Sequence, residues 1–166
     1  MNDNSTSADI FELARSNKAE ELQSALSGTD INATDSRGAT ALIIASYHNN
    51  AEATKVLLDA GAATDLQDSM GNTALMGVCF KGYTAIGELL LQYDAAVDVP
   101  NGNGATALTF AATFNHADLI KVLLAHGADK TLRDRFGKNP VDYARIQENI
   151  EALRILAPEL LEDEDL

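Results

Sequence analysis

The side chains that could support catalysis or metal binding are few in this chain of 166 residues. The candidates are three histidines, His48, His116 and His126, and a single cysteine, Cys79. No two of them stand four residues apart, the spacing with which one helix face presents a pair of zinc ligands. We therefore expect no metal, no cofactor and no Ser-His-acid set, and an inert, packed thiol at Cys79.

Two short runs contain glycine and could suggest a phosphate-binding loop. These runs are Asn101-Gly102-Asn103-Gly104 and Asp68-Ser69-Met70-Gly71. Neither has the lysine or the spacing of a phosphate loop, so both are interpreted as turns. Because the sequence contains no recognisable catalytic set, we turn to the structural elements that position these residues.

A fixed repeat organises those elements. Thr40-Ala41-Leu42, Thr73-Ala74-Leu75 and Thr106-Ala107-Leu108 each follow the previous copy by 33 residues, and Asn139-Pro140-Val141 is a fourth, altered copy. A glycine precedes each copy by two residues, and a V/L-L-L run followed by Gly61, Asp94 or Gly127 comes later in three of them. A period of this size indicates a stacked array of small units.

The repeated pattern D-x-x-G-x-T-A-L, followed by V/L-L-L-x-x-G-A, closely resembles the ankyrin repeat. The resemblance covers roughly residues 9 to 158. Two signature positions depart from the family: the proline survives only as Pro140, and the histidine is replaced by Ile43, Met76, Thr109 and Asp142. We expect the Thr–His hydrogen bonds of the family to be missing, and stability per repeat to be lower.

The resemblance implies an all-α fold, an ankyrin-repeat solenoid of stacked helix-turn-helix units joined by β-turn or hairpin-like loops. We expect a single domain over residues 1–166. Its parts are a degenerate N-terminal cap repeat (9–34), full repeats at 35–67, 68–100 and 101–133, a C-terminal cap repeat (134–157) and an acidic tail (158–166).

Within a repeat, the threonine is expected to cap an inner helix of about nine residues, and a tight turn leads to an outer helix that ends at Gly61 or Gly127. Repeat 68–100 departs from this pattern, with Gly77 and Gly87 inside its helices and Asp94 in place of the terminating glycine. Drift, or room for bulky neighbours such as Phe110, is one interpretation. A hinge between two halves is the other.

Charge and composition narrow the possible partners. The net charge of −13 argues against binding to nucleic-acid backbones and to anionic membrane surfaces. The polar N-terminus is unlike a signal peptide, no apolar run reaches the length of a membrane span, and one cysteine excludes an internal disulfide. We expect a cytoplasmic, monomeric protein whose partners are one or more proteins.

The family typically binds partners through the exposed face of the inner helices and the turn tips. Tyr47, Phe80 and Phe114 place one aromatic on each of three successive inner helices, either as ordinary core or as an interface. Lys130, Arg133, Arg135 and Lys138 crowd the last turn tip, either as a solvated tip neutralised by the acidic tail or as a contact for an acidic segment. The partner-binding residues predicted from these positions are Arg37, Tyr47, His48, Met70, Phe80, Lys81, Phe114, Arg133, Arg135 and Phe136.

These observations predict a non-enzymatic protein-interaction module. Its partner would lay an apolar stripe along the three rings and place negative charge near Arg133 and Arg135. The alternative is an acidic inhibitor or mimic that occupies a basic site on another protein; its affinity would fall steeply with added salt. An engineered scaffold is disfavoured by the helix glycines and by Asp94.

Overall fold

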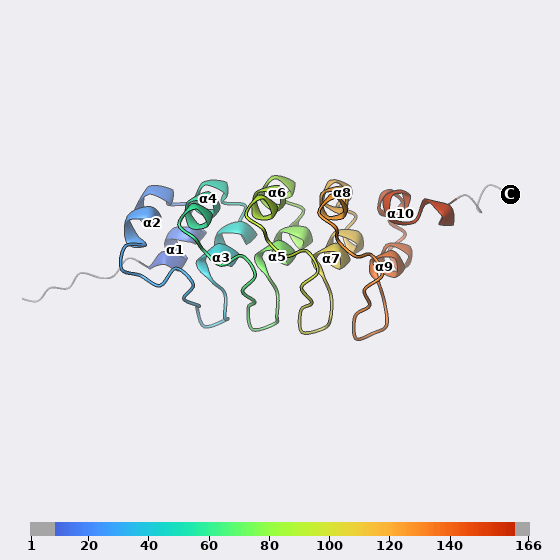
Figure 1. The fold of residues 1–166 in the computed structure, drawn as a ribbon, viewed down its shortest axis with the longest axis horizontal. Helices are drawn as coiled ribbons and strands as arrows, with labels where there is room; N and C mark the ends of the chain where they lie inside the picture. The colour runs from blue at the N-terminus through green and yellow to red at the C-terminus, as the bar shows by residue number, and fades with distance from the viewer. Residues whose placement is uncertain (1–8, 162–166) are drawn as a thin grey trace, which may run out of the picture.

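Between residues 9 and 161, ten α-helices form five antiparallel pairs, stacked side by side along one axis (Figure 1). The computed structural model describes residues 9–161. Residues 162–166, most of the predicted acidic tail, lie outside the described range. The helices are α1 (Ile10–Arg15), α2 (Ala19–Ala25), α3 (Ala41–Tyr47), α4 (Ala51–Asp59), α5 (Ala74–Lys81), α6 (Thr84–Gln92), α7 (Ala107–Thr113), α8 (Ala117–Ala125), α9 (Pro140–Ile146) and α10 (Ile150–Leu156), followed by a 3₁₀ turn, η1 (Pro158–Leu160).

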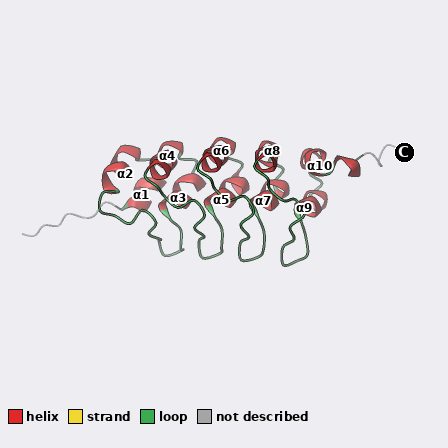
Figure 2. Ribbon diagram, in the orientation of Figure 1, coloured by secondary structure: helices red, strands yellow, loops and turns green. Residues whose placement is uncertain are grey.

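The odd-numbered helices form an inner row and the even-numbered helices an outer row, and each helix contacts the next one in its own row. The long loops that precede α3, α5, α7 and α9 project to one side of the inner row as turn tips (Figure 1). No strand occurs between residues 9 and 161, where Thr34 and Thr40 form an isolated bridge (Figure 2). The all-α solenoid expected from the repeat is confirmed.

The inner helices begin at the residues that the repeat singles out. The side chains of Thr40 and Thr73 accept hydrogen bonds from the amides of Ile43 and Met76, which satisfies one free donor of each first turn. The helices then run seven or eight residues, shorter than the nine expected. They stop because a left-handed residue follows, as at Asn49 (φ 60°) and Gly82 (φ 85°).

Two of the residues that replace the signature histidine form a hydrogen bond with the residue at the start of their helix. Thr109 Oγ1 accepts from the amide of Thr106 at 3.1 Å, and Asp142 Oδ2 accepts from the amide of Asn139 at 3.0 Å. Each completes a reciprocal capping box. In the last two repeats, Thr109 and Asp142 thus bond back to the helix start from the position of the family's histidine.

A ladder of fully buried leucines fills the space between the two rows. Leu57, Leu90, Leu123 and Leu156 stand 33 residues apart and are fully buried. Burying a leucine stabilises a fold by roughly 1.5–3 kcal/mol, so each added repeat brings its own share of the core. The 33-residue register is thus also the spacing of the core.

The glycines of repeat 68–100 have a packing reason. A Cβ at Gly77 would lie 3.3 Å from the Tyr47 ring, and one at Gly87 would lie 2.6 Å from Leu119 Cδ2. The bulky neighbours are therefore Tyr47 and Leu119, and not Phe110 as expected. Asp94 has the left-handed φ of 62° that its place after α6 requires. Whether this repeat is a hinge stays a prediction.

Hydrogen bonds join neighbouring repeats at the turn tips. Ser69 N donates to Arg37 O, Gly102 N to Met70 O and Arg135 N to Asn103 O, at 2.9–3.0 Å. The predicted binding residues at the tips are therefore held in a row by main-chain bonds.

A second set of bonds clamps the turns between inner and outer helices. Asn50 Nδ2 donates to Ala14 O and Arg15 O, and Asn149 Nδ2 donates to Ala112 O and Thr113 O. The equivalent residue of the third pair is Tyr83, which makes no such bond within residues 9–161. The two ends of the stack are therefore clamped at this level, while the interface between the second and third pairs is not.

Candidate protein-binding groove

The three predicted aromatic side chains meet on the inner face of the stack. The Tyr47 and Phe80 rings stack nearly parallel with centroids 6.5 Å apart, and the Phe80 and Phe114 rings meet edge to face at 4.9 Å. Tyr47 ends α3 and Phe80 lies in the last turn of α5, whereas Phe114 is the residue that caps α7. The rings thus form one continuous aromatic row across three repeats.

This aromatic row is neither plain core nor freely exposed. Tyr47 and Phe80 keep 39% of their surface exposed and Phe114 keeps 46%. Phe110 supports Phe80 edge to face at 6.4 Å. Each ring therefore packs on one side and faces solvent on the other, and an interface on the exposed side stays a prediction.

Polar residues flank the aromatic row. Lys81 Nζ lies 5.2 Å from the centroid of the Tyr47 ring, and the His48 ring meets Tyr47 edge to face at 5.8 Å. His116 Nε2 lies 3.1 Å from Phe80 O, and its ring fits where a Cβ at Gly82 would stand. The predicted residues His48 and Lys81 thus lie at the edge of the row, and both are exposed.

The turn tips form one wall of a groove, and the aromatic row on the inner helices forms the other. Arg37 and Met70 lie exposed on successive tips, with 68% of the Met70 surface accessible. Phe136, on the last tip, is 59% exposed, and the Arg135 guanidinium lies 4.8 Å from the centroid of its ring. Between tips and inner helices lies a hollow of about 240 Å³, bounded by the Tyr47 and Phe80 rings.

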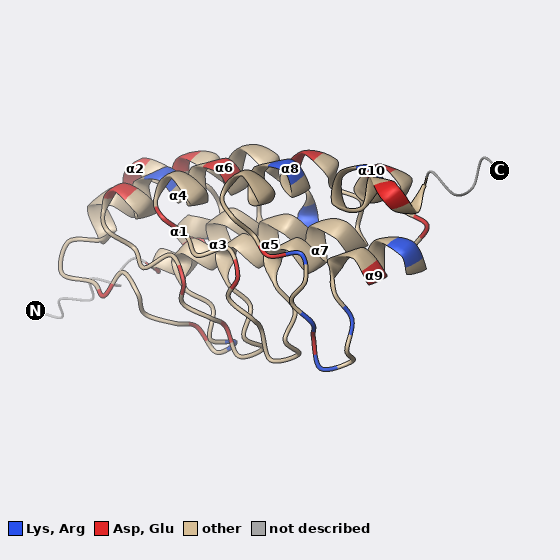
Figure 3. Cartoon of the chain, turned by 45° about the vertical axis from the view of Figure 1, so that its right-hand side comes forward, with Lys and Arg blue, Asp and Glu red and all other residues tan. Residues whose placement is uncertain are grey.

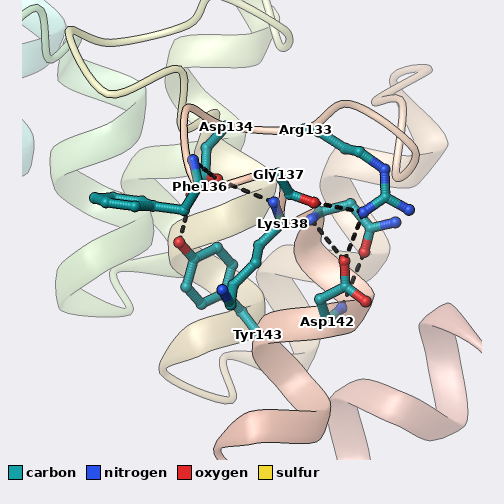
Figure 4. A network of polar contacts seen from close by, with 8 residues as sticks. Arg133, Asp134, Phe136, Gly137, Lys138, Asp142 and Tyr143 are labelled. Atoms are coloured by element: carbon teal, nitrogen blue, oxygen red, sulfur yellow. Dashed lines mark hydrogen bonds and ion pairs between the residues drawn. The ribbon is translucent and has the colours of Figure 1, made fainter.

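The basic cluster lies on the last tip (Figure 3), and two of its four basic side chains bond within the molecule, as Figure 4 shows for Arg133. Arg133 Nη1 lies 2.9 Å from Asp142 Oδ2 and donates to Gly137 O at 2.6 Å. Lys130 Nζ donates to Leu156 O, at the end of α10. Arg133 is exposed but already paired, so Arg135 and Lys138 remain the better candidates for an acidic partner.

The negative charges of two carboxyl groups lie close to these basic residues. The amide of Asn139 lowers the pKa of the Asp142 carboxyl most, and Arg133 lowers it further against the effect of burial. Burial alone would raise the pKa of Asp134, but the Tyr143 hydroxyl and the amides of Lys138 and Phe136 outweigh it and lower that pKa. Carboxylates of the repeat itself thus offset part of the positive charge of this tip.

Comparison with protein-family models identifies the repeat. Residues 10–101 match a model described as ankyrin repeats in three copies, and residues 89–144 match a second described as ankyrin repeats in many copies. The chain belongs to the ankyrin repeat family. A comparison of this ankyrin-repeat protein with curated proteins found no match. Ankyrin repeats are generally non-enzymatic modules of protein–protein interaction.

The residues considered for catalysis or metal binding are dispersed in this ankyrin-repeat structure. Cys79 is completely buried in α5, and burial raises the pKa of its thiol, which disfavours the reactive thiolate. Between residues 9 and 161 no group of three His, Cys, Asp or Glu side chains is placed to hold a metal ion. No helix in that part of the chain is long and apolar enough to cross a membrane.

Sequence reasoning missed two parts of the ankyrin groove. It did not assign Phe110 to the aromatic row, and it did not see the hollow beside Gly77. A signal was present, because the residues 33 positions before and after Gly77 are Ile44 and Phe110, both large and apolar. A single glycine in such a series marks a missing side chain.

Proposed function

We propose that this ankyrin-repeat protein acts without catalysis and binds one or more partner proteins along its inner face. The aromatic row of Tyr47, Phe80 and Phe114 supports this most strongly. Aromatic side chains contribute much of the binding energy at protein interfaces. The rings of this row pack against one another, and each leaves one side accessible to a partner protein.

The turn tips extend the proposed site. Met70 and Phe136 add exposed apolar surface, and Arg37 and Arg135 add positive charge beside it. A partner segment with an apolar stripe and an acidic stretch would match this arrangement. Such a segment would cross several repeats at once, since the main-chain bonds between tips keep them in line.

The test is capture of partners by the immobilised protein, compared among three variants. Phe80→Ala is expected to weaken a true groove partner by more than 1 kcal/mol, or about fivefold in affinity. Arg135→Glu is expected to weaken a partner that carries an acidic stretch. Tyr93→Ala is the matched control, since Tyr93 caps α6 in the outer row, away from the aromatic row.

A protein that binds Phe80→Ala and the unaltered chain equally would remove the aromatic row from the interface. A loss that occurs equally with Tyr93→Ala would point to general destabilisation of the repeat stack. Selective loss with Phe80→Ala, and not with Tyr93→Ala, supports the groove.

The second candidate function, an acidic mimic, is favoured by the net charge of −13. Acidic residues occur along the outer helices, opposite the turn tips (Figure 3). A mimic would therefore bind through the outer row. Its affinity would fall steeply with added salt and with Glu52→Gln and Glu88→Gln together, whereas a groove partner would respond little to either change.

The proposal includes that this protein is cytoplasmic and monomeric. Cell fractionation and sedimentation of the purified chain are the corresponding tests. A stable dimer that covers the aromatic row would contradict it.

A further inference from the structure

The hollow on the inner face lies beside an inner-helix position that has no side chain. Gly77 occupies the position that Ile44, Phe110 and Tyr143 fill in the other repeats, each 33 or 66 residues away. The hollow measures about 240 Å³ between the Tyr47 and Phe80 rings, with Met76 and Phe110 in the wall. A cavity of about 150 Å³ already accepts a benzene molecule, so this hollow admits one aromatic ring.

The last repeat shows what fits beside this position. There the Tyr143 hydroxyl donates to Asp134 Oδ2, while Asp134 Oδ1 accepts the amides of Phe136 and Lys138 (Figure 4). Tyr143 follows Asp134 by nine residues, as Gly77 follows Asp68. The two repeats therefore share the carboxylate, and only the last one contains the phenol.

Asp68 keeps the acceptor geometry of Asp134. Its Oδ1 accepts the amides of Met70 and Asn72, both at 2.9 Å, which fixes the carboxylate at the wall of the hollow. Within residues 9–161, its Oδ2 accepts no hydrogen bond. Asp68 thus presents a charged acceptor beside an aromatic-lined space of the size of one ring.

We propose that this hollow, the Gly77 slot, receives a tyrosine side chain of the partner protein, whose ring replaces the missing one and whose hydroxyl donates to Asp68. The proposal rests on the proposed function and names the side chain that anchors the partner in the groove. A cationic side chain is the weaker candidate, since the Lys81 ammonium already lies over the Tyr47 ring.

The direct test uses 4-methylphenol, the tyrosine side chain as a free molecule, and NMR of the labelled full chain. We expect saturable shifts at the Met76 methyl and the Gly77 amide, and about tenfold weaker binding of 4-methylanisole, which has no donor. Equal binding of the two would reduce the slot to a general apolar hollow. Tighter binding of n-butylammonium would assign it to a cation, and either result overturns the proposal.

Two variants test what the Asp68 carboxylate contributes to binding, apart from what the volume of the Gly77 slot contributes. Asp68→Asn is expected to weaken 4-methylphenol about tenfold and to keep the turn, because Asn101 makes the same Oδ1 contacts one repeat later. Asp35→Asn is the matched control, because Asp35 does not line the Gly77 slot, and we expect no change. Unaltered binding by Asp68→Asn would overturn the role of the carboxylate.

A second measurement needs no ligand. Gly77→Tyr is expected to fill the slot from inside and to melt about 2 °C above Gly77→Phe, with the difference lost in the Asp68→Asn background. The Cβ contact of 3.3 Å with the half-exposed Tyr47 ring leaves room for adjustment. No difference between the two variants would contradict the hydrogen bond.

Both tests use the isolated chain. A negative result therefore removes the tyrosine assignment while the Phe80→Ala comparison still decides the groove. Conversely, a partner that ignores Phe80 would remove the proposed function even if the slot binds 4-methylphenol.

Discussion

Asn149 clamps the last helix pair onto the rest of the stack, and its replacement by alanine should loosen that pair alone. Its Nδ2 donates to Ala112 O at 2.9 Å and to Thr113 O at 2.8 Å. It makes no side-chain cap for α10, so no capping bond is lost with it. The effect of Asn149→Ala is therefore confined to the interface between the last two repeats.

The magnitude follows from these two bonds. A neutral hydrogen bond contributes about 0.5–1.5 kcal/mol net, and water can reach the freed carbonyl of the half-buried Thr113. We expect a loss of about 1–2 kcal/mol at this interface. In the described part of the chain the last pair contacts only one other helix pair, so in a solenoid this loss appears as local opening of α9 and α10.

Native-state hydrogen exchange measures this opening. Amides of α9 and α10 are expected to exchange about tenfold faster in Asn149→Ala, since about 1.4 kcal/mol corresponds to a factor of ten, while amides of α5 and α6 stay unchanged. Asn103→Ala is the matched control at an exposed tip residue. Equal acceleration in α5 and α6 would show that the stack opens as one unit and would refute the local clamp.

Three further predictions follow from single residues. Asp94→Gly relieves a left-handed φ of 62°, and we expect about 0.5–1 kcal/mol more stability in thermal denaturation; an unchanged melting temperature would show that no strain is stored there. Cys79 is buried with a raised thiol pKa, so Ellman's reagent should label it only upon unfolding; rapid labelling of the folded chain would contradict its burial. Burial, and then the bond to Asp134, raises the pKa of Tyr143 from 10.0 to about 12. The folded chain holds this proton more tightly than the unfolded chain, so the stabilisation is present below about pH 10 and is lost as the pH rises toward 12. Urea denaturation across this range should show a smaller alkaline loss for Tyr143→Phe than for the unaltered chain, and equal losses would refute the assignment.

The groove residues differ in how well the sequence located them. Tyr47, Phe80 and Phe114 were found because an aromatic at the end of successive inner helices must lie on one face of the stack. Arg133 was also placed correctly on its tip, but its bond to Asp142 joins residues nine positions apart across a turn. That pairing depends on the path of the loop, which residue types alone do not specify.

The amino-acid sequence by itself determined the repeat, the helix starts at Thr40 and Thr73, and the left-handed residue at Asp94. These features depend on interactions within a few residues, where backbone sterics and capping follow directly from residue type. Only the tertiary structure decided that the rings are half-exposed and that Gly77 leaves a slot beside Asp68. Those properties arise between residues some 30 positions apart, and they depend on how closely one repeat packs against the next.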